Sequence, residues 1–505
     1  MSTKSTIYTI LNTVVVYLRL FLDKMLDFLF SLYWDDKKQI IPDLDKRHAI
    51  LTESAVTLAK KIKAKELKSE DLVRAVIERI KEVNPIINAI VSDRYEAALE
   101  DARQVDRLVA AGLSDQDADK PFLGVPFTTK ESQEIKGFCN TMGLWSRRNV
   151  VSKEDSDAVM LLKSAGAIPL AATNLPELLI WQETRNPVYG MTLNPHHTGR
   201  SPGGSSGAEA ALCATFATPI SLCSDIGGST RMPAFYCGMF GHHPTAGITS
   251  IKGVFFRKGD EGDTMFCLGF ISRCVEDLAP LTKVIAGNKA HLLNLDKNDI
   301  KFYYMESADD RLVSPVRQEM KNAIKLSEEV SAPERYSHAG FRHMYRLWSY
   351  WMSREPDDYM ALYGDGQTPN AFLELAKKLK YLPNVDTAWA ESITKEMKED
   401  LFSATRVTMS QGKLGDNGVL LLPSSPHAAP FHYSAVLRPF NFSYFGIVNV
   451  LKCPATQVPL GTNSVGLPIG IQVLAAPHND RLCLAVAKYL EKEFGGFVIK
   501  NYFLF

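Results

Sequence analysis

The stretch "DIGGSTRMP" (residues 225–233) places two adjacent glycines and two adjacent hydroxyl side chains at what its flanks predict to be a strand-to-helix corner. Glycine adopts backbone conformations that are closed to other residues. With Gly227 and Gly228 at this corner, the four backbone amides of residues 226–229 could point into one concavity. A concavity of amides at a helix start stabilises an oxyanion, and this makes Ser229 a candidate nucleophile.

A serine nucleophile needs a general base, and the chain offers a lysine for this role. The strand-like segment "FLGVPFTTK" (residues 122–130) ends in Lys130. A free lysine has a pKa of about 10.4, but burial disfavours the charged form and lowers that pKa. The glycine-rich turn "GGSSG" (residues 203–207) carries Ser205, which could relay a proton between Lys130 and Ser229.

The segments around these motifs alternate between helix-like and strand-like patterns. The predicted helices cover residues 51–64, 70–83, 95–112 and 157–166, and the predicted strands cover 87–92, 122–130 and 167–174. Ser69 is predicted to cap the second helix, and the Asn84-Pro85 pair is predicted to end it. This alternation predicts a layered α/β sheet.

The pattern becomes more helical at residues 303–409 and returns to strands at 418–426. The aromatic segment "FRHMYRLWSYWM" (residues 341–352) either packs in the core or lines an apolar tunnel, with Tyr345, Trp348 and Trp351 as its candidate wall. We therefore predict one catalytic domain, residues 47–505, with a helical insertion at about 303–409.

Residues 1–36 form a predicted hydrophobic membrane-anchoring helix, and the polar residues 37–46 form a predicted linker. At 100° per residue one stripe of this helix is polar, and it contains Asn12, Arg19, Asp23 and Asp27. The rest of its surface is mainly Ile, Leu, Val and Phe. Such a helix can lie in a membrane interface or pass through the membrane with its stripe against a partner. The alternative is a long amphipathic helix docked on the protein's own core.

Composition and motif spacing exclude several function classes. The formal net charge is zero, with 57 basic and 57 acidic residues, and their scatter gives no nucleic-acid footprint. The eight cysteines form no C-x-x-C pair, which favours buried free thiols. The histidine pairs 196–197 and 242–243 lack metal-site spacing. No G-K-[ST] motif accompanies "GGSSG", and no buried strand leads into it as a hydrolase elbow would require. We expect neither a metal nor a cofactor.

Together the motifs resemble the amidase signature family. "GGSSGAEAAL" (residues 203–212), the serine of "DIGGSTRMPAF" and "GVPFTTK" carry the resemblance, which extends over about residues 50–500 and includes "LLLPSSPHAAP" and "GLPIGIQVLA". It implies a central mixed, twisted β-sheet covered by helices on both faces.

The resemblance also implies a set of site residues. The implied catalytic residues are Lys130 as base, Ser205 as relay serine with a cis peptide, and Ser229 as nucleophile. The implied oxyanion amides are those of Ile226, Gly227, Gly228 and Ser229, and the implied supporting residues are Ser206, Asp225 and Arg231. The chain departs from the family pattern at Ala208, usually glycine, and at His243, often lysine.

Within the family, residues 224–244 and the hydrophobic N-terminus look most like the members that hydrolyse fatty acid amides. This implies a serine hydrolase that cleaves primary amides and N-acyl amines through an acyl-enzyme. It would work without a cofactor on a membrane or lipid-droplet surface, inside the cell on the endoplasmic reticulum or on lipid droplets. The alternatives are a short-chain or N-acyl amino acid amidase, the glutaminase component of an amidotransferase, and a non-catalytic lipid-binding protein. The sequence leaves open whether the chain forms a homodimer.

Overall fold

The computed structural model describes residues 3–497 except for 256, 258–259, 261, 263, 293–299, 332, 357–384 and 403–411. Its main strands are β1 (Ile90–Asp93), β2 (Pro126–Lys130), β3 (Ile168–Thr173), β6 (Ile220–Asp225), β7 (Phe240–His243), β8 (Cys267–Ser272), β9 (Lys301–Tyr304), β10 (Glu334–Arg335), β11 (Gly418–Pro423), β12 (Ala455–Thr462) and β13 (Pro468–Ala475). Within the described residues these strands form an 11-stranded mixed sheet in the order β1-β3-β2-β6-β8-β7-β12-β13-β11-β9-β10.

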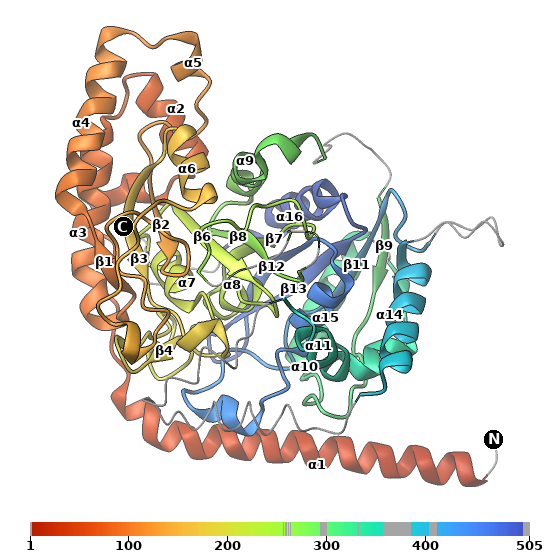
Figure 1. Ribbon diagram of the computed structural model, residues 1–505. Helices are drawn as coiled ribbons and strands as arrows, with labels where there is room; N and C mark the ends of the chain where they lie inside the picture. The colour runs from red at the N-terminus through yellow and green to blue at the C-terminus, as the bar shows by residue number, and fades with distance from the viewer. Residues whose placement is uncertain are drawn as a thin grey trace.

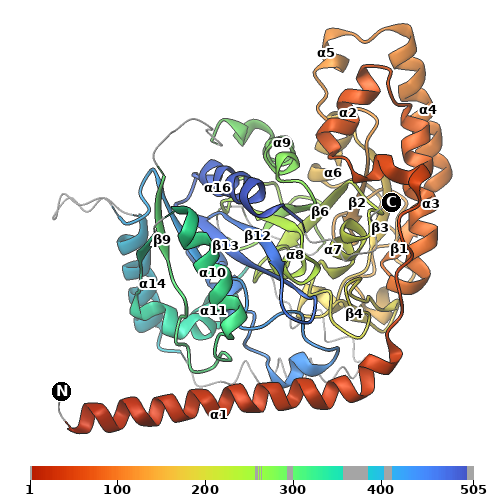
Figure 2. The same cartoon turned by 180° about the vertical axis from the view of Figure 1, so that it is seen from behind.

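Helices flank this sheet, as the alternating pattern predicts. They are α2 (Ala55–Lys63), α3 (Ser69–Ile87), α4 (Tyr95–Ala111), α5 (Asp115–Ala118), α6 (Asp157–Ser164), α7 (Gly207–Ala214), α8 (Arg231–Cys237), α9 (Val275–Ala286), α10 (Gln318–Ser331), α11 (Met344–Met352), α14 (Thr387–Phe402), α15 (Ser443–Leu451) and α16 (Asp480–Phe494). Figures 1 and 2 show α9 and α16 above the central strands and α11 below them. The expected α/β architecture is confirmed.

The sheet brings two motifs to one edge because β2 and β6 are parallel neighbours. Their carboxyl ends therefore meet at the same edge, which is where open α/β sheets place their sites. Strand β2 ends at Lys130, and β6 ends at Asp225, directly before the glycine corner. Both strands are buried along their whole length, so the polar ends of the two strands lie inside the protein.

Two predicted boundaries of the second helix are wrong. Ser69 lies inside α3, and the carboxylate of Asp106 on α4 instead accepts the N–H groups of Ser69 and Glu70 at 2.7 and 3.0 Å. The helix also continues through Pro85 to Ile87. It ends only at Asn88, whose left-handed conformation (φ 50°) is typical of a helix C-terminus.

The segment predicted as a helical insertion contributes to the sheet as well. It holds α10, α11 and α14, but Tyr303 and Tyr304 of β9 pair with β10 in parallel register. Strand β9 in turn pairs with β11. The insertion thus builds one edge of the sheet, and residues 357–384 and 403–411 within it lie outside the described residues.

The first helix, α1 (Thr3–Trp34), docks on the body through its polar stripe. Asp23 pairs with Arg438, and Asp27 pairs with both Arg438 and Arg317, at 3.2, 2.8 and 2.6 Å. Arg19 donates to the backbone carbonyls of residues 311 and 313. The side chain of Asn12 lies outside the described residues. The helix is docked, but the buried face is the polar one.

Helix α1 runs along the base of the molecule (Figures 1 and 2). The face opposite its polar stripe is apolar and exposed. Its exposed large apolar side chains are Val14, Val15, Val16, Tyr17, Leu18, Phe21, Leu22, Met25, Phe28, Leu29, Leu32 and Tyr33. The expectation of a possible membrane-crossing helix finds no support, because no helix among the described residues has both the length and the apolar character needed for a span.

Candidate active site

Lys130 lies fully buried at the end of β2. Its Nζ donates to Ser205 Oγ at 2.7 Å and to Ser224 Oγ at 3.0 Å. Burial lowers the pKa of Lys130 to about 7, because a buried ammonium loses its hydration. The amine can therefore lose its proton near neutral pH, which a general base requires.

Ser205 sits in the glycine-rich turn before α7, and its side chain is fully buried. The peptide bond between Gly204 and Ser205 is cis, as the family resemblance implies. The next residue, Ser206, donates its N–H to the carbonyl of Ser229 at 3.2 Å. This contact joins the glycine-rich turn to the glycine corner. In the described part of the chain, no hydrogen bond joins the hydroxyls of Ser205 and Ser229.

The glycine corner leaves three backbone amides available. Among the described residues, the N–H groups of Ile226, Gly227 and Ser229 have no hydrogen-bond acceptor. Gly228 differs, because its N–H donates to Asp225 Oδ1 at 2.7 Å. The prediction of four available amides is therefore wrong at Gly228. The exposed fraction of Ser229 is 9% and Gly227 is half-buried, so the corner is most accessible at Gly227.

The backbone conformation of the corner depends on Gly228. Its φ is +110°, and a Cβ there would lie 2.2 Å from the Cβ of Phe445 on α15. A side chain would therefore meet both backbone strain and a steric clash. Gly227 does not have a positive φ, so only one of the two glycines takes the conformation that the sequence suggested.

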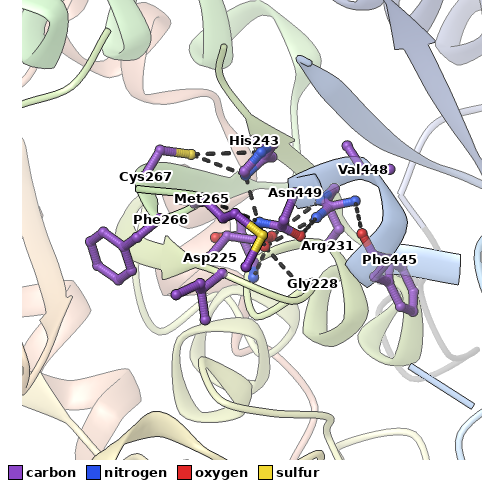
Figure 3. A network of polar contacts seen from close by, with 12 residues as sticks. Asp225, Gly228, Arg231, His243, Met265, Phe266, Cys267, Phe445, Val448 and Asn449 are labelled. Carbon is purple, nitrogen blue, oxygen red and sulfur yellow. Dashed lines mark hydrogen bonds and ion pairs between the residues drawn. The ribbon is translucent and has the colours of Figure 1, made fainter. Parts of the chain in front are cut away.

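A buried network of polar contacts holds the glycine corner in place (Figure 3). Asp225 accepts from Gly228 N–H and Thr230 N–H, and it pairs with Arg231 through Nη2 at 3.0 Å. Arg231 also donates to Asn449 Oδ1 at 2.8 Å and Gln472 Oε1 at 2.7 Å. Burial alone would raise the pKa of Asp225, but Arg231 holds it below its usual range. The predicted supporting residues Asp225 and Arg231 are thus brought together.

His243 occupies the position where the family often has lysine. Burial lowers the pKa of His243 to about 3, so its ring is neutral at neutral pH. The ring lies 3.0 Å from Cys267 Sγ and 3.8 Å from Asp225 Oδ1 (Figure 3). Arg231 is then the cation that neutralises Asp225. Ala208, the other departure from the family pattern, is buried in α7.

An aromatic cluster covers the outer side of the corner. Trp348 on α11 donates its Nε1–H to the carbonyl of Ile226 at 3.0 Å. Phe442 lies edge-on to Trp348 with ring centroids 4.7 Å apart, and Tyr345 lies 4.4 Å from Phe440. Two of the three predicted wall residues are therefore in this cluster. The third, Trp351, donates instead to Thr394 on α14.

Sequence reasoning missed several polar residues of this site. Lys130 donates to Ser224. Arg231 donates to Asn449 and Gln472, and Trp348 donates to the carbonyl of Ile226 in the corner. Two of them carry a signal in hindsight, since Asn449 in "FGIVNVL" and Gln472 in "GIQVLA" are single amide side chains inside apolar runs. A lone buried amide needs partners, but sequence alone does not name them.

No group of three or more His, Cys, Asp or Glu side chains could hold a metal ion in the described residues. All eight cysteines are unpaired, and six of them are buried. Each of the two histidine pairs has a ring in contact with a carboxylate: His197 with Asp35, and His242 with Asp480.

Comparison with known proteins relates about nine tenths of the chain to amidases and an amidotransferase component. Residues 71–322 match the family model described as Amidase. The chain is 40% identical to fatty-acid amide hydrolase 2 of Homo sapiens, over 90% of this chain and 91% of the relative. It is 37% identical to fatty-acid amide hydrolase 2-A of Danio rerio, over 88% and 90%. A component of the glutamyl-tRNA(Gln) amidotransferase from Oleidesulfovibrio alaskensis is 29% identical, over 88% and 97%.

Solved structures share the fold. A structure titled fatty acid amide hydrolase aligns with a TM-score of 0.71 at 20% identity, over 90% of this chain and 87% of that one. A 6-aminohexanoate cyclic dimer hydrolase aligns with a TM-score of 0.69 at 22% identity, over 88% and 97%. These two likenesses concern the fold alone. Because 40% identity extends over nine tenths of a curated relative, this chain belongs to the amidase signature family.

Proposed function

We propose that this amidase is a serine hydrolase that cleaves fatty acid amides, both primary amides and N-acyl amines, to a free fatty acid and ammonia or an amine. The observation that carries the proposal is the buried amine of Lys130, which donates to Ser205 Oγ at 2.7 Å behind a corner with available amides. The likeness to fatty-acid amide hydrolase 2 over 90% of the chain supports the acyl class.

The proposed reaction passes through an acyl-enzyme. Neutral Lys130 takes the proton of Ser229 through the hydroxyl of Ser205, and Ser229 Oγ forms a bond to the substrate carbonyl carbon. The amides of Ile226, Gly227 and Ser229 donate to the resulting oxyanion. The carbon–nitrogen bond then breaks, and the leaving amine takes the proton held by Lys130. A water molecule hydrolyses the acyl ester by the same route.

The apolar surroundings of the corner suit a long acyl chain. Trp348 and Phe442 stack edge-on beside Ile226, and Tyr345 packs against Phe440. Each methylene that such a surface buries contributes about 0.8 kcal/mol. A short-chain amidase would gain nothing from this cluster, which favours the fatty acyl substrate over that alternative.

We further propose that α1 attaches the enzyme to a membrane or lipid-droplet surface, in the endoplasmic reticulum or on lipid droplets. The carboxylates of the polar stripe of α1 form ion pairs with Arg438 and Arg317, and this docking leaves the apolar face of the helix exposed. An interfacial helix has the same division into one polar and one wide apolar face. A long-chain amide resides in lipid, so attachment would bring the enzyme to its substrate.

The nucleophile is tested by covalent labelling. A fluorophosphonate probe should label the wild-type protein, and Ser229→Ala should abolish labelling and lower turnover by on the order of 10⁴-fold or more. Ser205→Ala should cost less, because water can replace a hydroxyl in proton transfer but not in covalent attack. The exposed Ser392→Ala serves as control. Labelling of Ser229→Ala would contradict the role of Ser229 as nucleophile. A wild-type protein that is not labelled would favour the lipid-binding alternative.

The base is tested by a pH profile. Protonated Lys130 cannot accept a proton, so kcat/KM for a soluble amide should rise with pH up to about 7, the pKa of Lys130, and then level off. Lys130→Ala and Lys130→Arg should both lower the rate by on the order of 10²-fold or more, since arginine stays protonated. Lys163→Ala, which removes an exposed lysine, should leave the profile unchanged. A near-normal Lys130→Ala rate would point to another base.

The acyl class is tested with primary amides of rising chain length. If the cluster around Trp348 buries the acyl chain, kcat/KM should increase by up to about fourfold per added methylene. Trp348→Ala should flatten that slope more than it changes hydrolysis of the shortest amide. A flat wild-type profile, or a preference for short or N-acyl amino acid substrates, would overturn the fatty acyl assignment.

Surface attachment is tested on the exposed face of α1. The triple variant Phe21→Ser, Phe28→Ser, Leu32→Ser should reduce co-sedimentation with phosphatidylcholine vesicles by on the order of 100-fold and leave hydrolysis of a soluble amide unchanged. Val465→Ser removes an apolar side chain of similar exposure (69%) in the turn between β12 and β13 and should bind as the wild type does. Unchanged binding of the triple variant would contradict the proposal.

A further inference from the structure

We propose that Glu209 on α7 is a positioning residue for Lys130: a buried carboxylate whose charge sets how tightly Lys130 holds its proton. This inference rests on the proposed role of Lys130 as general base. Glu209 is fully buried in the first turn of α7, four residues after Ser205. Burying a carboxylate costs free energy unless a partner compensates its charge. The proposed amidase reaction gives Glu209 no role.

The geometry places Glu209 on the same side of the sheet as the lysine. Thr128 and Lys130 are two residues apart on β2, so their side chains lie on one face. Thr173 is the register partner of Lys130 on β3. Thr128 Oγ1 donates to Glu209 Oε2 at 2.6 Å, and Thr173 Oγ1 donates to Glu209 Oε1 at 2.9 Å. The two hydroxyls that flank Lys130 therefore both hold this carboxylate.

The other charges that face Lys130 are already compensated. They are Cys223, Asp225 and Arg257. Asp225 pairs with Arg231 at 3.0 Å, and Arg257 pairs with Glu355 at 3.4 Å. Burial raises the pKa of the Cys223 thiol well above its usual range, so this side chain is neutral at neutral pH. Glu209 remains as the carboxylate whose charge acts on Lys130 without an arginine beside it.

The side chains around Glu209 are hydroxyl groups and neutral thiols. Its hydrogen-bond donors are hydroxyl groups, and the thiols that face it, Cys213 and Cys223, are kept neutral because burial raises the pKa of each. Burial also raises the pKa of Glu209 to about 7. The carboxylate and the amine thus titrate in one pH range, and each favours the charged form of the other.

This pairing has a consequence for the proposed reaction. Burial alone weakens Lys130 as a base, whereas a negative Glu209 strengthens it. A stronger base takes the proton of Ser229 more readily and holds it until the amine leaves. The hydrogen bonds of Glu209 come from Thr128 and Thr173 and not from Ser229, so its effect on the reaction would pass through Lys130.

The test compares the pH profiles of Glu209→Gln and the wild type for kcat/KM on a soluble amide. Removing the negative charge should move the midpoint of the acid limb down by about one pH unit and lower the plateau a few-fold, because Lys130 becomes a weaker base. The rate of fluorophosphonate labelling of Ser229 should show the same shift. Structural damage would scale the profile without moving its midpoint.

Two further variants complete the design. Thr173→Val removes a donor that stabilises the Glu209 anion, so it should shift the midpoint in the same direction by less, and it carries the test if Glu209→Gln does not fold. Asp277→Asn is the matched control, a buried carboxylate that accepts the backbone N–H groups of Ala55 and Val56 instead. If Lys130→Ala is inactive but the midpoint of Glu209→Gln equals that of the wild type, this inference is overturned and the proposed base is not. Near-normal activity of Lys130→Ala overturns the proposed base itself.

Discussion

The candidate site of this amidase depends on the burial of one amine, that of Lys130. Lys130 has two hydroxyl groups as hydrogen-bond partners, from Ser205 and Ser224. An ammonium in such a place loses hydration that hydroxyls do not fully replace, so its pKa falls to about 7. The parallel pairing of β2 with β6 makes this burial possible, because it encloses the end of β2 beside the glycine corner. Any change that admits water there would return the lysine to its charged form.

The corner in turn depends on distant parts of the chain. Asp225 and Arg231 lie in the same turn, but Arg231 reaches Asn449 on α15 and Gln472 on β13 for its remaining partners. A buried ion pair is stable only if its other donors and acceptors are satisfied. Helix α15 and strand β13, from the C-terminal part of the chain, therefore complete a candidate site whose proposed reactive groups lie in the first half of the chain.

The orientation of α1 reverses the usual arrangement of an amphipathic helix. Its charged stripe is buried against Arg438 and Arg317, and its apolar face is exposed. The segment 430–445 connects the polar stripe of α1 to the site, since it carries Arg438 at one point and Phe442, beside Trp348, at another. The docking of α1 and the aromatic cover of the corner thus depend on one segment of the chain.

The sequence by itself determined the α/β class, most elements and the family, and it named Lys130, Ser205 and Ser229 as candidate site residues, because local periodicity and long ordered motifs carry that information. Only the tertiary structure decided that Asp106 caps α3 and that β10 extends the sheet. It also decided which face of α1 is buried. The physical reason is the same in each case: the partner of a polar group lies far away in sequence, and its approach depends on how the elements pack, which no local pattern encodes.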